Sequence, residues 1–172
     1  YKRTGTPIHP MSPLSKIFWM KHEQPDIYQN TAMFADIKTY IFYQLYGKYV
    51  IDHSMASATG MFNLQQLDWD QEALELLGIS ASQLPQLVPT THILKGMKKR
   101  YATLMGIDEN TPVVVGASDG VLSNLGVNSY KKGEVAVTIG TSGAIRTVID
   151  KPRTDYKGRI FCYVLDEDHY VI

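Results

Sequence analysis

The sequence predicts an α/β fold with a helix-rich first part and a β-rich second part. Apolar residues recur at helical spacing between residues 13 and 105. Runs of β-favouring residues follow one another from residue 112 onward. A chain of 172 residues is also long enough to bury a hydrophobic core. We place the boundary between the parts within 113–132 and expect domains 1–122 and 123–172.

Capping residues set the ends of the helices expected in the first part. Ser12 is a favourable N-cap, and Pro13 suits the first position of a helix that stops before Pro25. Gly47 and Gly78 can each end a helix in the left-handed conformation. The expected helices are 13–24, 32–46, 70–77 and 97–105, the third capped by Asp68 or Asp70.

The β-rich part begins with PVVVG at 112–116, which has the length and composition of a short buried strand. Residues 118–127 can form a helix after it. The β-favouring segments that follow are EVAVTIG, AIRTVI, RIFCYVL and HYVI. Their succession favours hairpins over alternating βα units.

Composition argues against several classes of function. The 17 Lys and Arg residues balance the 17 Asp and Glu residues, so net charge gives no reason to expect a nucleic acid or membrane partner. No apolar run approaches the roughly 18 residues that a membrane span needs. A single cysteine, Cys162, cannot form an internal disulfide, which fits the cytoplasm. The five histidines lack metal-binding spacing, so we expect no metal site.

The segment GASDG at 116–120 supports two chemical interpretations. It matches the G-x-S-x-G pattern of a serine hydrolase, with Ser118 as nucleophile and carboxylates and His169 following in the required order. That fold needs earlier strands of the same sheet, and residues 1–110 offer almost none. Alternatively, Asp119 lies at the end of a buried strand and acts as general base for a hydroxyl nucleophile. A structural explanation is that Asp119 only caps the next helix.

The segment GTSG at 140–143 lies between two β-favouring runs. Its glycines have a structural explanation, because tight hairpin turns need residues that adopt positive φ. In a functional interpretation, small residues leave backbone N–H groups accessible, and Thr and Ser add hydroxyl donors for phosphate oxygens. With Asp119, the segment would supply a base and a phosphate loop about twenty residues apart, as phosphoryl transfer to a hydroxyl requires.

Four stretches resemble the FGGY carbohydrate kinases, a family of glycerol, xylulose and gluconate kinases in the actin/hexokinase-like superfamily. TGTPIHPMSPLSKIFWMKHE resembles the first family signature, with Lys16 and Trp19 at its spacing and His22 as a departure. SMASATGMFNLQQLDWD resembles the segment that leads to a W-[DS] motif. NTPVVVGASDG and AVTIGTSGAI resemble the TPV-x-x-G-x-x-D strand and the second phosphate loop. The last two are the most specific, because their order and spacing also match.

The resemblance implies a fold and a set of roles. Members have two ribonuclease-H-like domains with ATP and sugar in the cleft between them. This chain would hold the helical end of the first domain and the start of the second. Asp119 corresponds to the catalytic base, which also contacts the substrate. Gly140, Thr141, Ser142 and Gly143 correspond to the loop near the β- and γ-phosphates of ATP.

The resemblance also implies that parts of the enzyme lie outside this chain. The chain begins without Met and stops inside an expected strand, so we expect a piece of a longer protein. The family's Mg²⁺-binding Asp and first phosphate loop would precede Tyr1, and its adenosine pocket would follow Ile172. ATP and Mg²⁺ are the expected cofactors, and the fragment alone is expected to be inactive.

The substrate expected from the resemblance is gluconate. Met11 falls where glycerol kinases carry a substrate-contacting Tyr, which argues against glycerol and leaves Met11 and Ser12 as sugar-pocket candidates. HPMSP and ADIKTYI are most similar to the gluconate kinase branch, with xylulose kinase as the nearest alternative. Lys38 is a further possible substrate contact, but we expect it to point to solvent.

We therefore expect ATP-dependent phosphorylation of gluconate to 6-phosphogluconate by a cytoplasmic enzyme. A homodimer is common in relatives, and neither nucleic acid nor membrane is an expected partner. A catalytically inactive sugar- or nucleotide-binding protein of the same fold is a further alternative, although the presence of Asp119 argues against it.

Overall fold

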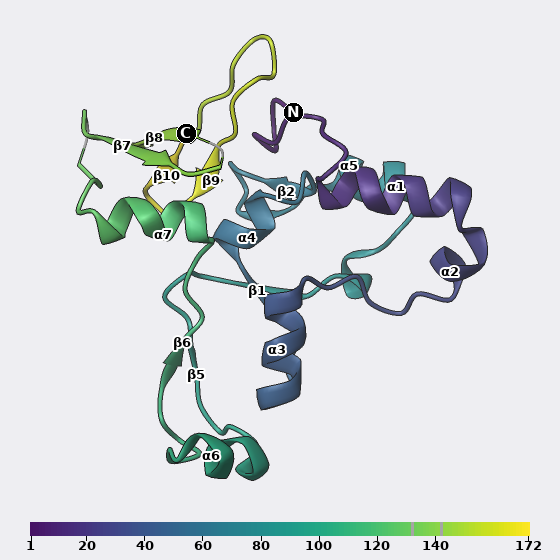
Figure 1. Ribbon diagram of the computed structural model, residues 1–172. Coiled ribbons are helices and arrows are strands. Elements are labelled where there is room, and N and C mark those ends of the chain that lie inside the picture. The colour runs from purple at the N-terminus through teal and green to yellow at the C-terminus, as the bar shows by residue number, and fades with distance from the viewer. Residues whose placement is uncertain (132, 142) are drawn as a thin grey trace.

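The computed structural model describes residues 1–131, 133–141 and 143–172. Within these residues the helices are α1 Pro13–Glu23, α2 Pro25–Gln29, α3 Ile37–Tyr46, α4 His53–Ser57, α5 Gln71–Leu77, α6 Lys99–Met105 and α7 Asp119–Gly126, with a 3₁₀ turn at Ala81–Gln83. In Figure 1 the short helix α4 lies at the centre, with α1, α2 and α5 on one side and α7 on the other. No helix of this described part is long and apolar enough to cross a bilayer.

The strands are short in the first part of the chain and form a sheet in the second. They are β1 Val50–Asp52, β2 Phe62–Asn63, β3 Asp68–Trp69, β4 Gln86–Val88, β5 Ile93–Leu94, β6 Val113–Val114, β7 Val135–Ile139, β8 Gly143–Ile149, β9 Tyr163–Val164 and β10 Tyr170–Val171. β1 and β4 pair in parallel, and the four-stranded sheet has the order β7-β8-β10-β9. The parallel pair was not predicted, because each strand spans only three residues.

Capping residues fix the helix ends largely as the sequence predicts. The side chains of Ser12 and Asp70 accept hydrogen bonds from the first-turn amides of α1 and α5. Gly47 and Gly78 end α3 and α5 in the left-handed conformation. α3 begins later than predicted, because Asp36 is its N-cap and residues 33–36 have no regular secondary structure.

One face of the hairpin of β7 and β8 packs against α7. Side chains two residues apart on a strand share a face, so Arg146 and Val148 of β8 point the same way. Val148 is buried with Val121 of α7 in one apolar cluster. The outer face carries Val137 and Ile145, which are exposed. The face with Arg146 is therefore the one that meets α7.

The strand predicted at PVVVG differs from the structure. β6 covers only Val113 and Val114, pairs antiparallel with β5, and leaves Val114 56% exposed. Val115, just after the strand, is the buried residue. The prediction that Asp119 ends a buried strand is therefore wrong: a short loop separates β6 from α7, whose first residue is Asp119.

The predicted domain boundary at 122/123 falls inside α7. That helix packs through Val121 against the sheet, and Ala117 before it belongs to the same apolar cluster. The start of α7 therefore contacts both parts of the chain, because Ser118 also accepts a hydrogen bond from Ser54 of α4. The division into 1–122 and 123–172 stays a prediction.

Candidate active site

Asp119 presents an exposed carboxylate at the first position of α7. Its Oδ1 accepts a hydrogen bond of 2.6 Å from the Gly120 amide. Ser118 holds the N-cap position but makes no side-chain capping bond, so Asp119, as an acidic residue of the first turn, is the side chain that accepts from an amide there. Among the residues that the structure describes, the Asp119 carboxylate forms no ion pair. A carboxylate with this freedom can accept a proton from a bound hydroxyl.

Ser118 anchors the start of α7 to the centre of the molecule. Its hydroxyl accepts a hydrogen bond of 3.1 Å from the Ser54 hydroxyl, and its amide donates to Ser54 Oγ at 3.2 Å. Ser54 lies in α4 and is fully buried. These two bonds fix the backbone immediately before Asp119.

The residues of the serine hydrolase alternative do not come together. His169 pairs with Asp166 at 2.8 Å and lines a hollow with Leu125, near the C-terminal end of α7. Ser118 precedes the N-terminal end, and the helical rise separates it from Leu125 by about 10 Å. The hydroxyl of Ser118 meets another serine instead of a histidine. This arrangement argues against Ser118 as a nucleophile.

Lys38 does not point to solvent, so that prediction is wrong. Its Nζ lies 2.6 Å from Oδ2 of Asp52, whose side chain is fully buried at the end of β1. It also donates to the carbonyl oxygen of Ala117 at 3.4 Å. Asp52 in turn caps α4 through the Met55 amide at 2.9 Å. The pair therefore links α3, α4 and the loop that precedes Asp119.

Arg146 lies directly against the start of α7. A Cβ added to Gly120 would stand 3.1 Å from Nη2, 3.2 Å from Nε and 3.3 Å from Cζ of this arginine. The guanidinium thus occupies space that a side chain at position 120 would need. Sequence analysis missed Arg146, although a single cation in the apolar run AIRTVI was a signal that could have drawn attention to it.

Tyr163 of β9 adds a half-buried phenol to the same region. Burial raises its pKa to about 12, so the phenol stays protonated at neutral pH. The charge of Arg146 acts to lower this pKa and that of Asp119 acts to raise it. The two opposite charges therefore both act on one phenol of the sheet.

The predicted phosphate loop lies at the tip of the hairpin. Gly140 and Thr141 are exposed between β7 and β8, and Gly143 is the exposed first residue of β8. Ser142 lies outside the described residues. The body of this hairpin packs on α7 through Val148, and its Arg146 lies against Gly120, the residue after Asp119.

Met11 and Ser12 lie apart from this unit. Figure 1 shows α1, which follows them, on the far side of α4 from α7. Met11 is 73% exposed. Ser12 is buried, and its hydroxyl donates to the His9 carbonyl and accepts from the Ser15 amide. The helix cap gives Ser12 a structural role that needs no substrate.

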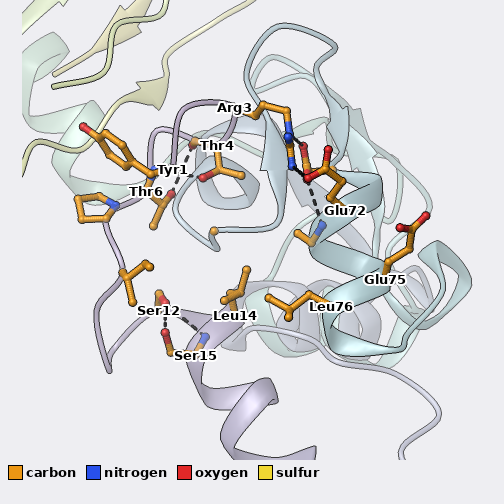
Figure 2. A pocket seen from close by; sticks show the side chains of 15 residues that line it. Tyr1, Arg3, Thr4, Thr6, Ser12, Leu14, Ser15, Glu72, Glu75 and Leu76 are labelled. Carbon is orange, nitrogen blue, oxygen red and sulfur yellow. Dashed lines mark hydrogen bonds and ion pairs between the residues drawn. The ribbon is translucent and has the colours of Figure 1, made fainter. Parts of the chain in front are cut away.

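A hollow of about 670 Å³ lies next to Ser12, away from Asp119. Figure 2 shows Ser12 and Ser15 at one end and Arg3 reaching toward Glu72 at the other. Arg3 also binds Asp70, through Nε to Oδ2 at 2.6 Å. Burial opposes ionisation of Asp70, but hydrogen bonds from Arg3, the Ala73 amide and Asn63 outweigh it and lower the pKa of the carboxyl.

Kinases use a magnesium ion, so the side chains that could hold a metal ion are of interest. No group of three or more His, Cys, Asp or Glu side chains in the described part of the chain is placed to hold a metal ion. We therefore assign no magnesium ligand among the described residues.

Comparison with known proteins identifies the family. Residues 1–126 match the N-terminal domain of the FGGY family of carbohydrate kinases. Over all 172 residues the chain is 63% identical to the gluconokinase of Bacillus subtilis (strain 168), of which it covers 34%. A gluconate kinase and a ligand-bound xylulose kinase, both from Lactobacillus acidophilus, have structures that match 99% of the chain at 42% identity and a TM-score of 0.96. The chain covers 35% of each.

These findings define the class of protein. The fold is the actin/hexokinase-like fold of sugar kinases. The chain belongs to the FGGY family of carbohydrate kinases. It spans about a third of the length of two curated gluconokinases that it matches.

Proposed function

We propose that the protein carrying this chain is an ATP-dependent kinase that phosphorylates gluconate to 6-phosphogluconate. The chain would supply the end of the first domain and the start of the second, within 1–122 and 123–172. The observation that carries the proposal is the exposed Asp119 carboxylate at the start of α7, which forms no ion pair with the described residues, in a chain 63% identical to a gluconokinase. Xylulose is the second candidate substrate, because a xylulose kinase structure matches the chain equally well.

In this proposal Asp119 acts as general base. Its carboxylate takes the proton of the acceptor hydroxyl while that oxygen forms a bond to the γ-phosphorus of ATP. The bond from the γ-phosphorus to the β–γ bridging oxygen breaks, and ADP leaves. Catalysis of this kind depends on positioning and charge stabilisation. The two hydrogen bonds between Ser54 and Ser118 would keep the base at a fixed place.

The remaining roles follow from the same proposal. Gly140, Thr141, Ser142 and Gly143 would contact the ATP phosphates, and Mg²⁺ would accompany the nucleotide. Met11, Ser12 and Asp119 stay proposed substrate contacts, although helix α1, which follows the first two, lies on the far side of α4 from α7 (Figure 1). We also propose a cytoplasmic enzyme that can form a homodimer. The 172 residues alone would be inactive, since they span about a third of the curated relatives.

An acceptor panel tests the proposed function. ADP release from ATP and Mg²⁺ would be measured for the full-length protein with gluconate, xylulose, ribulose, glycerol and rhamnulose. The proposal predicts turnover with gluconate at a kcat/KM well above that of the others. Preference for xylulose would replace the proposed substrate, and no turnover with any acceptor would favour an inactive binding protein.

A further inference from the structure

Arg146 is a cation placed beside the proposed base without being paired to it. Its guanidinium lies against Gly120, the residue that follows Asp119. Among the residues that the structure describes, Arg146 forms no ion pair. The one hydrogen bond that its side chain donates to the described residues, from Nη1 to Thr138 Oγ1, is long at 3.5 Å. Most of the five N–H donors of this side chain therefore remain available to a ligand.

The surroundings of Arg146 favour an anionic ligand. The side chain is half-buried on the face of β8 that meets α7, so part of its hydration is already lost. A partly desolvated guanidinium gains most from a carboxylate or phosphate, because its planar fork matches two oxygens at once. Gly120 is the residue that makes room for the guanidinium there.

We propose that Arg146 binds an anionic oxygen group of a substrate next to Asp119. This inference rests on the proposed function and extends it. The group is either the carboxylate of the sugar acid or the phosphoryl group in transfer, since both present oxygens that fit the guanidinium fork. In either case Arg146 is a residue of the substrate site that contacts substrate directly.

Two binding titrations with the full-length protein distinguish the two sources. Gluconate would be titrated without nucleotide, and ADP with aluminium fluoride, which mimics the phosphoryl group in transfer, would be titrated in the presence of gluconate. Arg146→Gln is expected to weaken one of these affinities about 10- to 100-fold, the usual effect of losing charge-assisted hydrogen bonds. Weaker gluconate binding assigns the carboxylate, and weaker aluminium fluoride binding assigns the phosphoryl group.

Arg146→Lys and an arginine far from the site serve as controls. Lysine keeps the charge but loses the fork, so it is expected to recover only part of the affinity. Arg100 lies on α6, which Figure 1 shows at the end of the molecule remote from α7. Arg100→Gln should therefore leave both titrations unchanged.

A matched pair of glycine substitutions tests the position without removing the charge. Gly120 and Gly126 both lie in α7, and neither has a positive φ. Gly120→Ala puts a methyl group against the guanidinium and should weaken the same titration as Arg146→Gln. Gly126→Ala adds the same methyl group where nothing lies within 4 Å, so affinity should not change. Melting temperatures of both variants show whether the fold is intact.

Two outcomes separate this inference from the proposed function. If the wild-type protein phosphorylates gluconate and Arg146→Gln matches it within threefold in both titrations, the role of Arg146 is wrong and the kinase proposal stands. If the wild-type protein neither binds nor phosphorylates any acceptor of the panel, the proposed function itself has failed.

Discussion

Asp52 is a buried carboxylate whose removal tests how the site is held. It is fully buried, caps α4 through the Met55 amide, and binds Nζ of Lys38 at 2.6 Å. Asp52→Ala removes the cap and leaves Lys38 without this partner. Because Lys38 also reaches the Ala117 carbonyl, the loop before Asp119 loses a contact as well.

The expected loss is about 3 kcal/mol of unfolding free energy. Loss of an N-cap side chain costs about 1 kcal/mol. Breaking a buried ion pair costs about 3–5 kcal/mol when the remaining charge stays buried. The Lys38 side chain is 25% exposed and can turn toward water, so we reduce this second contribution to about 2 kcal/mol.

Thermal unfolding of the full-length protein measures this effect. For a domain of 150–250 residues, 1 kcal/mol lowers the melting temperature by about 2–4 °C, so Asp52→Ala should lower it by about 6–12 °C. Asp26→Asn is the matched control, because Asp26 is exposed in the first turn of α2. A change of less than 0.5 kcal/mol, the usual range for surface sites, would refute the description of Asp52 as a buried, paired cap.

Two further predictions concern pH and thiol chemistry. The pKa of Asp70 is lowered in the folded state, so its ionisation stabilises the fold above about pH 4 and that contribution is lost as pH falls through the folded pKa. Asp70→Ala should therefore be less stable than wild type by a constant amount, about 1–2 kcal/mol, from pH 7 to 5, and the difference should shrink below pH 4; a difference that grows in acid contradicts this. Burial raises the pKa of the Cys162 thiol, so iodoacetamide at pH 7.5 should label it only after unfolding, and rapid labelling of the folded protein would contradict its burial.

Local signals predicted the helix ends well and the pairing of short strands poorly. Ser12, Asp70, Gly47 and Gly78 act as caps because capping depends on residues a few positions apart. The pairing of β1 with β4 joins segments more than thirty residues apart through three residues each, and no local pattern encodes it. Strand β6 was predicted to be buried although Val114 is exposed, because no local pattern shows that β6 pairs with β5.

The sequence singled out the candidate-site residues that belong to recognisable motifs, but not those outside them. Asp119 was singled out because it follows a recognisable strand-like motif; its side chain is exposed at the start of α7, and its role as a base stays a prediction. Lys38 was predicted to point to solvent, and Arg146 was missed. Both errors have one cause, because the residues they contact, Asp52 and Gly120, are distant in sequence. Such contacts appear only when the hairpin and helices are packed together.

The most direct test of the central claim is the turnover of Asp119→Asn in the full-length protein. Asparagine keeps the shape of the side chain but cannot accept a proton, so kcat for gluconate should fall by about 10²–10⁴-fold, while Asp26→Asn should behave as wild type. Circular dichroism would confirm that both variants are folded. Turnover of Asp119→Asn within threefold of wild type would show that Asp119 is not the base, and the account of this site would be wrong.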